Sequence, residues 1–217
     1  MKIIFIPGLG YDHRIFKSLE LSYPMIAYLD WIDPKKGEHI HAYAQRLFSK
    51  IKDDAQDIVL IGHSLGGIVA QEIASVHKIH KVILLSSITS RKEMPFSFRI
   101  AKPLRLDLFF TKEISIHTIN YWGKSHGFET KSDKQLFKDM VGLQSNRYLQ
   151  WALRELSSWH APKLPNTTQL IQIHGTRDKT FPIKHINHPD IIIEQGTHIF
   201  VYKQAKKTTD IIHKILK

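Results

Sequence analysis

Short apolar runs rich in β-branched residues alternate with stretches of helical spacing, and this alternation restricts the possible folds more than any other feature. The apolar runs lie at residues 2–7, 25–31, 57–61, 81–86, 169–174 and 190–194. Helical spacing marks residues 39–51, 65–76 and 203–216. Strands separated by helices pair in parallel. We therefore predict an α/β fold with a mostly parallel sheet of about six strands flanked by helices.

The alternation of strand and helix patterns is interrupted from about residue 89 to about residue 165. This stretch is much too long for an ordinary loop, and helical patterns occur at residues 134–143 and 147–159. We expect it to be a helical lid inserted into the sheet domain. No repeat, low-complexity stretch or Gly/Ser-rich linker divides the chain, so residues 1–217 are predicted to form a single domain with this insertion.

Composition is that of an ordinary globular protein, with 42% apolar and 24% charged residues. Cysteine is absent, which fits a reducing compartment. The apolar run at the N-terminus is shorter than a signal peptide requires, and no stretch approaches the length of a membrane span. These features favour a cytoplasmic protein.

The chain is basic, with 31 Lys and Arg against 20 Asp and Glu and a formal net charge of +11. Strong basic charge is typical of nucleic-acid binding when it is clustered. Here the cations are scattered and no run of five to eight basic residues occurs. We therefore expect solvated surfaces and no nucleic-acid partner, although the charge would attract an anionic substrate.

Residues 58–67 read Ile-Val-Leu-Ile-Gly-His-Ser-Leu-Gly-Gly and contain the pattern G-x-S-x-G between an apolar run and a helical stretch. In that setting the serine hydroxyl stands on a strained turn clear of the sheet. The residues two before and two after the serine come close together, and glycine at positions 62 and 66 avoids a clash. Ser64 is therefore a candidate nucleophile. The alternative is that Ser64 only caps the following helix. His63, beside it, is expected to be a packing residue and not a catalytic one.

This turn resembles the nucleophile elbow of the α/β-hydrolase superfamily, in which Gly-His-Ser-Leu-Gly-Gly is frequent. The resemblance covers residues 1–90 and 166–217, and it implies an esterase-like serine hydrolase with the chain order serine, acid, histidine. His174-Gly-Thr-Arg-Asp178 resembles the family's His-Gly-x-x-Asp segment, which makes Asp178 the implied acid. Some relatives place the acid after the preceding strand, where this chain has no carboxylate before Glu93.

The implied base is His198, which follows the last apolar run and a small-residue turn and precedes the final helix. A base must accept the serine proton, and the acid orients the base. Because the chain holds 14 histidines, composition alone selects none of them. His174 and His188 remain the rival candidates.

Two backbone N–H groups must stabilise the developing oxyanion in such a mechanism. The resemblance implies the amide of Leu65, directly after the serine, and that of Leu9 in the loop after the first strand. That glycine-containing loop has neither the G-x-G-x-x-G pattern nor a Walker lysine. No cofactor is expected.

Histidine is plentiful in the chain, so closely spaced histidine pairs are candidate metal ligands. The nearest spacings are His39-x-His41 and His185-x-x-His188. Neither pair has the H-E-x-x-H form or a nearby carboxylate cluster, and two histidines do not fill a tetrahedral site. No metal site is predicted.

The stretch expected to form the lid is rich in aromatic residues, some of which should line an apolar pocket over Ser64. Trp151 and Trp159 share a helical face and are expected to pack the lid on the core instead. This composition favours a small-molecule carboxylic ester or thioester as substrate, cleaved through an acyl-enzyme. The alternatives are a cofactor-free peroxidase or lyase, or a ligand receptor with little turnover; a serine nucleophile argues against a dehalogenase.

Overall fold

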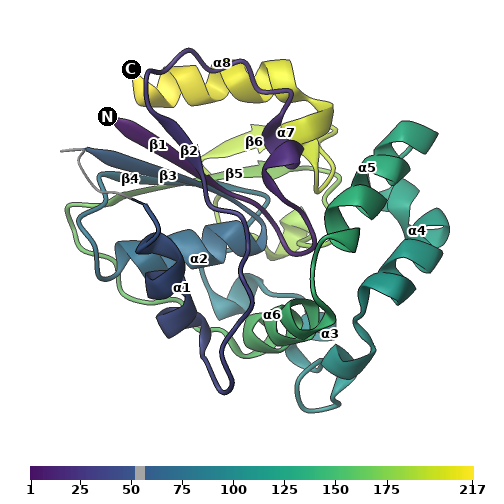
Figure 1. Ribbon diagram of the computed structural model, residues 1–217. Helices are drawn as coiled ribbons and strands as arrows, with labels where there is room; N and C mark the ends of the chain where they lie inside the picture. Colours follow the sequence, from purple (N-terminus) through teal and green to yellow (C-terminus); the bar gives the residue numbers. More distant parts are fainter. Residues whose placement is uncertain (52–56) are drawn as a thin grey trace.

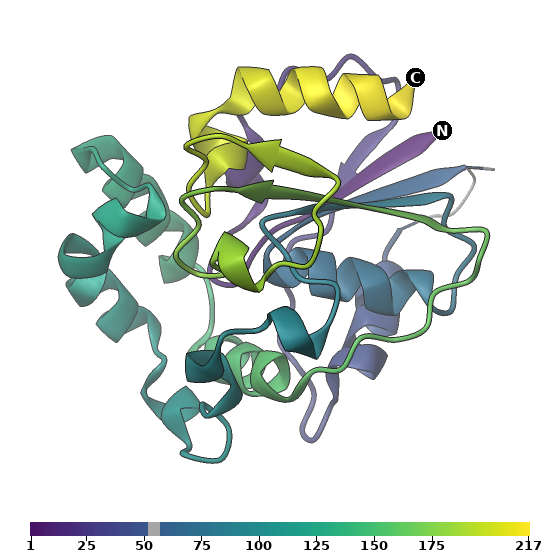
Figure 2. The same ribbon diagram turned by 180° about the vertical axis from the view of Figure 1, so that it is seen from behind.

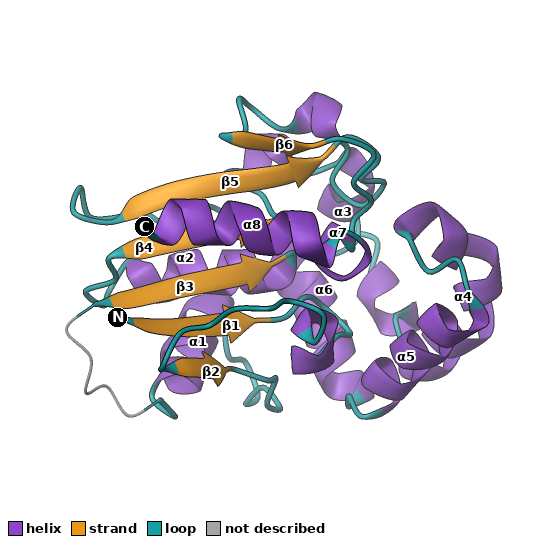
Figure 3. Ribbon diagram, turned by 90° about the horizontal axis from the view of Figure 1, so that it is seen from above, coloured by secondary structure: helices purple, strands orange, loops and turns teal. Residues whose placement is uncertain are grey.

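A six-stranded sheet forms the centre of the computed structural model, which describes residues 1–51 and 57–217. Every pair of neighbouring strands is parallel, in the order β2-β1-β3-β4-β5-β6 (Figure 3). The strands are β1 (Lys2–Ile6), β2 (Ile26–Tyr28), β3 (Ile58–His63), β4 (Lys81–Leu85), β5 (Gln169–Gly175) and β6 (Ile191–Ile193). The predicted α/β fold with a parallel six-stranded sheet is confirmed.

Helices cover both faces of the sheet, which explains why its central strands are apolar on both sides. Helices α1 (Ile40–Phe48) and α2 (Leu65–Ala74) lie on one face and α8 (Ala205–Leu216) on the other (Figures 1 and 2). All six residues of β3 are buried. One stripe of α1 is buried, as its spacing predicts.

Several elements differ in extent from the sequence prediction. The edge strands β2 and β6 each have only three residues, because each pairs with a single neighbour over a short register. The final helix is split into α7 (Phe200–Lys203) and α8. Gln204 lies between them with a non-helical φ of −121° and ψ of 43°.

Four helices occupy the stretch between β4 and β5: α3 (Phe96–Arg99), α4 (Lys112–His126), α5 (Lys131–Gly142) and α6 (Asn146–Ser158). They lie beyond the carboxyl ends of the strands (Figures 1 and 3). The expected helices at 134–143 and 147–159 are confirmed as α5 and α6, whereas α4 was not predicted. In the described ranges 1–51 and 57–217, no helix combines the length and the apolar character needed to cross a membrane.

Two tryptophans connect α6 to the sheet domain, as expected from their spacing. The indole Nε1 of Trp151 donates to the Glu38 carbonyl at 2.6 Å, and its ring lies 4.3 Å from that of Tyr43. Trp159 Nε1 donates to Glu72 Oε1 at 2.7 Å. Both tryptophans are buried, so they fix the position of α6 and do not contact the cavity described below.

Candidate active site

Ser64 occupies a strained turn between β3 and α2. Its φ of 52° and ψ of −119° lie outside the regions that non-glycine residues ordinarily adopt. The hydroxyl makes no capping bond to α2, which argues against the cap interpretation. A Cβ at Gly66 would lie 2.1 Å from the Ile6 carbonyl oxygen, and one at Gly62 would lie 2.4 Å from the Gly66 oxygen. The turn therefore requires both glycines.

Gly66→Ala is expected to lower the free energy of unfolding by more than about 2 kcal/mol, because its Cβ must displace backbone atoms of β1. Gly142 provides a matched control, since a Cβ there meets nothing within 4 Å. Gly142→Ala should leave stability within about 1 kcal/mol of wild type. Urea unfolding followed by circular dichroism measures both, and equal effects would contradict this account of the turn.

The structure brings Ser64, His198 and Asp178 together at the carboxyl edge of the sheet. His198 Nε2 lies 3.0 Å from Ser64 Oγ. His198 Nδ1 lies 2.9 Å from Asp178 Oδ2 and 3.0 Å from Oδ1. The three side chains come from the loops after β3, β5 and β6, and parallel strands end at the same edge. They form a continuous hydrogen-bonded chain.

The carboxylate of Asp178 is held in one orientation. The N–H groups of Thr180 and Phe181 donate to its Oδ1 at 2.8 and 2.9 Å. Burial raises the pKa of Asp178, but attraction to His198 and these hydrogen bonds outweigh burial and leave the pKa below its usual value. The ionised carboxylate therefore accepts the Nδ1 proton of His198, which leaves Nε2 free to accept a proton from Ser64.

Close contact between two loops brings the acid to the histidine. A Cβ at Gly175 would lie 2.3 Å from the Gly196 oxygen, so only glycine allows the loop after β5 to approach the loop after β6 this closely. The Arg177 N–H donates to the Gly196 carbonyl at 2.8 Å. Within the described ranges, neither cationic neighbour of Asp178 in the sequence forms an ion pair with it.

The rival histidines lie elsewhere. His174 is fully buried, and its Nε2 donates to the Phe181 carbonyl at 2.7 Å while lying 3.4 Å from Asp178 Oδ2. It supports the acid and does not contact Ser64. His188 is exposed on the loop before β6.

Glu93, the alternative acid, is also buried, but within the described ranges its hydrogen-bond partners do not include His198. Its carboxylate accepts hydrogen bonds from the backbone N–H groups of Thr89 and Asn187 at 2.7 and 3.0 Å. The side-chain amide of Gln172 donates to it at 3.1 Å. Glu93 therefore ties together the loops after β4 and before β6.

Leu9 and Ser64 both line the cavity over the reacting groups, and Leu65 directly follows Ser64 in the chain. Leu9 follows β1 within a turn in which the Tyr11 N–H donates to the Gly8 carbonyl at 3.0 Å. Leu65 begins α2, where the helix dipole is positive. Among residues 1–51 and 57–217, neither amide N–H has a hydrogen-bond acceptor. Both groups are therefore free to bind an oxyanion.

His63 lies behind the reacting groups, as expected for a packing residue. It is fully buried, and its Nε2 donates to the His198 carbonyl at 2.9 Å. Burial lowers the pKa of His63 to about 3, with repulsion from His198 adding to the shift. His63 is therefore neutral and fixes the backbone of the loop that carries His198.

This histidine should make the fold sensitive to acid. Below its unfolded pKa of 6.5 the unfolded chain binds a proton that the native state excludes down to about 3. Stability should therefore fall with decreasing pH in that window, with His63 contributing about 1.4 kcal/mol per pH unit. His63→Gln should reduce the slope of unfolding free energy against pH by that amount, and the exposed His160→Gln should not. Equal slopes for all three proteins would contradict the prediction.

A cavity of about 330 Å³ opens over Ser64 and His198, lined mostly by apolar side chains. Of the aromatic residues in the stretch 89–165, four line it: Phe98, Phe110, Trp122 and Phe137. Others point outward, since Phe96, Phe109 and Tyr121 are 73%, 69% and 89% exposed. Tyr11 and His126 also line the cavity, and neither was singled out from the sequence.

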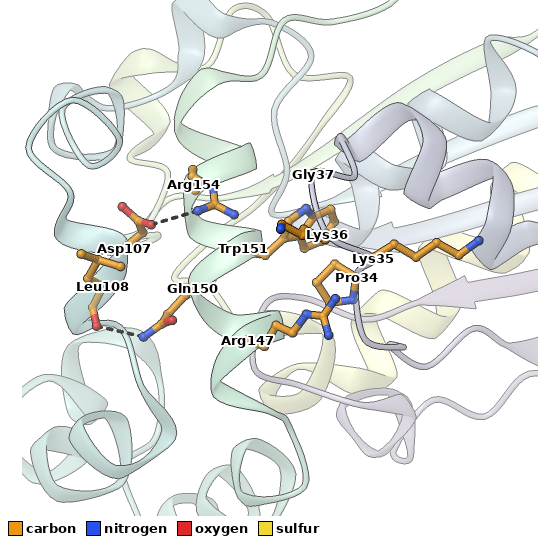
Figure 4. A pocket seen from close by; sticks show the side chains of 10 residues that line it. All are labelled: Pro34, Lys35, Lys36, Gly37, Asp107, Leu108, Arg147, Gln150, Trp151 and Arg154. Atoms are coloured by element: carbon orange, nitrogen blue, oxygen red, sulfur yellow. Dashed lines mark hydrogen bonds and ion pairs between the residues drawn. The ribbon is translucent and has the colours of Figure 1, made fainter.

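A second hollow, of about 510 Å³, lies on the opposite side of α6. Figure 4 shows Arg147 and Trp151 of α6 beside the loop that carries Lys35 and Lys36. Gln150 and Arg154 contact the residues facing them across the hollow. The hollow contains none of the three residues of the hydrogen-bonded chain. The reacting centre therefore lies in the smaller cavity over Ser64, although this second hollow has the larger volume.

Comparison with known proteins agrees with this architecture. An esterase from Exiguobacterium antarcticum superposes with a TM-score of 0.75 at 15% identity, over 99% of this chain and 91% of that one. MenH from S. aureus gives 0.70 at 18% identity, over 100% and 93%. A bromoperoxidase from Bacillus anthracis gives 0.71 at 15% identity, over 99% and 91%.

At these identities the structural likenesses establish the fold alone. No curated protein matches the chain by sequence. The sequence model of the Alpha/beta hydrolase family matches residues 3–209. Because this match spans nearly the whole chain, the protein belongs to the alpha/beta hydrolase family.

Proposed function

We propose that the protein is a serine hydrolase that cleaves a carboxylic ester or thioester of a small molecule. Ser64 is the nucleophile, His198 the general base and acid, and Asp178 the group that orients His198. The observation that carries this proposal is the unbroken hydrogen-bonded chain from Ser64 Oγ through His198 to Asp178, placed under an apolar cavity.

In the first half of the reaction, Ser64 Oγ attacks the carbonyl carbon while its proton moves to His198 Nε2. Asp178 stabilises the imidazolium that results, through the hydrogen bond at Nδ1. The N–H groups of Leu9 and Leu65 bind the oxyanion of the tetrahedral intermediate. His198 then returns the proton to the leaving oxygen or sulfur, and the alcohol or thiol departs from the acyl-enzyme.

In the second half, water attacks the acyl carbon and gives a proton to His198 Nε2. The same two amides stabilise the second tetrahedral intermediate. When this intermediate collapses, the proton passes to Ser64 Oγ and the carboxylic acid is released. The free enzyme is regenerated without a cofactor.

We propose that the stretch 89–165 acts as a lid over the reacting groups. It contributes Phe98, Phe110, Trp122, Phe137 and Leu153 to the cavity, which would exclude bulk water from the acyl-enzyme. The cavity volume of about 330 Å³ lies at the small end of the range for ligand sites. It therefore favours short to medium acyl groups.

Steady-state hydrolysis across ethyl esters and matching thioesters of increasing acyl length tests the proposal. We expect multiple turnovers, with the highest kcat/KM at short to medium chains. A protein that reacts once with a fluorophosphonate but turns over no ester or thioester would be a receptor-like member. A peroxidase or lyase would turn over its own substrates while leaving this whole series untouched.

A further inference from the structure

Apart from the reacting groups, the polar side chains that line the cavity over Ser64 include Tyr11, Ser115, Thr118, His126 and Thr180. The hydroxyls of Ser115 and Thr118 are satisfied by the protein. Thr118 Oγ1 donates to the Ile114 carbonyl at 2.7 Å and accepts from Trp122 Nε1 at 3.1 Å. The Ser115 hydroxyl donates to the Thr111 carbonyl at 2.8 Å. These contacts lie within α4 and its cap. Besides the hydroxyls of Tyr11 and Thr180, this leaves the imidazole of His126, at the end of α4, on the cavity wall.

The hydrogen bonds of His126 determine which ring nitrogen carries the proton. Nδ1 lies 3.0 Å from the Trp122 carbonyl oxygen, which can only accept. It also lies 3.0 Å from the Ser125 hydroxyl, whose own proton is donated to the same carbonyl at 2.7 Å. Nδ1 therefore carries the hydrogen, and Nε2 is a bare acceptor in the neutral ring. Nε2 has no partner in the part of the chain that the structure describes.

The ring of His126 is held in place. It packs edge-on against Trp122, with the ring centroids 5.3 Å apart, and α4 ends at once in Gly127, whose φ is 106°. Burial lowers the pKa of His126 and His198 repels its charged form, so the ring is neutral near pH 7. A neutral, fixed acceptor thus stands in a mostly apolar wall.

We propose that His126 Nε2 accepts a hydrogen bond from a hydroxyl group of the substrate, and that the enzyme prefers esters carrying a hydroxyl near the reacting carbonyl. This inference rests on the proposed hydrolase function. A purely apolar chain would desolvate Nε2 and leave it unsatisfied, whereas a hydroxyl would satisfy it. Sites that bind a substrate hydroxyl in this way reject the analogue that lacks it.

The test compares each hydroxylated ester with its unsubstituted analogue. One series of ethyl esters carries the hydroxyl at successive acyl carbons, and a second arm compares 2-hydroxyethyl with ethyl esters to place the hydroxyl on the alcohol side. In wild type, at least one hydroxyl position should raise kcat/KM about tenfold. His126→Phe, which keeps a ring but no acceptor, should reduce this ratio to about one, because the hydroxylated ester loses its hydrogen-bond partner. His126→Gln, whose amide oxygen reaches a similar position, should restore part of it.

Two variants of neighbouring hydroxyl residues check the assignment. Ser115→Ala and Thr180→Val each remove a hydroxyl from the same cavity wall. Loss of the preference in either of them, with its retention in His126→Phe, would overturn the role of His126. Efficient hydrolysis of esters with no preference for any hydroxyl position would overturn this inference and leave the proposed function standing. Absence of all ester and thioester turnover would overturn both.

Discussion

Ser64→Ala is expected to lower kcat/KM for ester hydrolysis by about three to six orders of magnitude and to abolish labelling by a fluorophosphonate. The reason is geometric. Within the described ranges, His198 Nε2 hydrogen-bonds to Ser64 Oγ alone, so no second hydroxyl can replace the nucleophile. The residual rate would come from oxyanion binding at Leu9 and Leu65 and from substrate binding.

Loss of activity in this variant can be separated from loss of folding. The Ser64 hydroxyl caps no helix, and alanine at φ 52° is strained to about the same degree as serine, so the thermal midpoint should change little. Ser49 supplies a matched control, because its hydroxyl makes only an exposed bond to the Arg46 carbonyl. Ser49→Ala should retain full activity. Undiminished turnover in Ser64→Ala would exclude the mechanism.

The sheet was predictable because its signal is local. Each central strand is buried on both faces, so it needs a short, wholly apolar segment such as Ile58–His63. The elbow was predictable for a similar reason: Gly62 and Gly66 are required by the approach of neighbouring backbone, and that requirement is visible in the sequence. Asp178 and His198 were implied by the resemblance of their segments to the α/β-hydrolase family, whereas the distances between them depend on how the two loops pack.

The helical stretch between β4 and β5 was predictable only in part. Helix α5 begins with a capping box at Thr130, and α6 has a broad buried face, so both have clear sequence patterns. Helix α4 buries only Ser115, Ile119 and Gly123, which is not an apolar stripe. Its spacing therefore gave no helical signal.

The residues that line the cavity could not be selected from the sequence. The aromatic content of residues 89–165 predicted that some of these side chains line a pocket, but they point toward the cavity, the core and solvent alike. Tyr11 lies outside that stretch, and its contact with Phe128 and Phe137 comes from tertiary packing. His126 is one histidine among 14, and its proposed role depends on which ring nitrogen bonds to the Trp122 carbonyl, which the sequence does not reveal.

The second large effect is expected for Asp178→Asn, which should lower kcat by about four orders of magnitude while KM changes little. The N–H groups of Thr180 and Phe181 both donate to Oδ1, so the asparagine must keep its carbonyl oxygen at that position. Its NH₂ group then takes the place of Oδ2, 2.9 Å from His198 Nδ1. The retained Oδ1 lies 3.0 Å from Nδ1 but already accepts two backbone N–H groups. The NH₂ group therefore donates to Nδ1 and favours the tautomer with the ring proton on Nε2, which cannot accept the proton of Ser64.

Measuring the thermal midpoint, kcat and the labelling rate together distinguishes this tautomer effect from disorder of the loop that carries Asp178. Because the substitution preserves shape and both backbone hydrogen bonds, the thermal midpoint should stay near that of wild type, and the rate of fluorophosphonate labelling should fall in parallel with kcat. Asp139→Asn is the matched control: Asp139 accepts a bond from Gln135 on the exposed side of α5 and should tolerate the change. A fall in kcat of less than about tenfold in Asp178→Asn would mean that another group orients His198. Residues 1–51 and 57–217 offer none, since His174, the other histidine beside Asp178, donates its Nε2 proton to the Phe181 carbonyl and has no contact with His198 Nδ1.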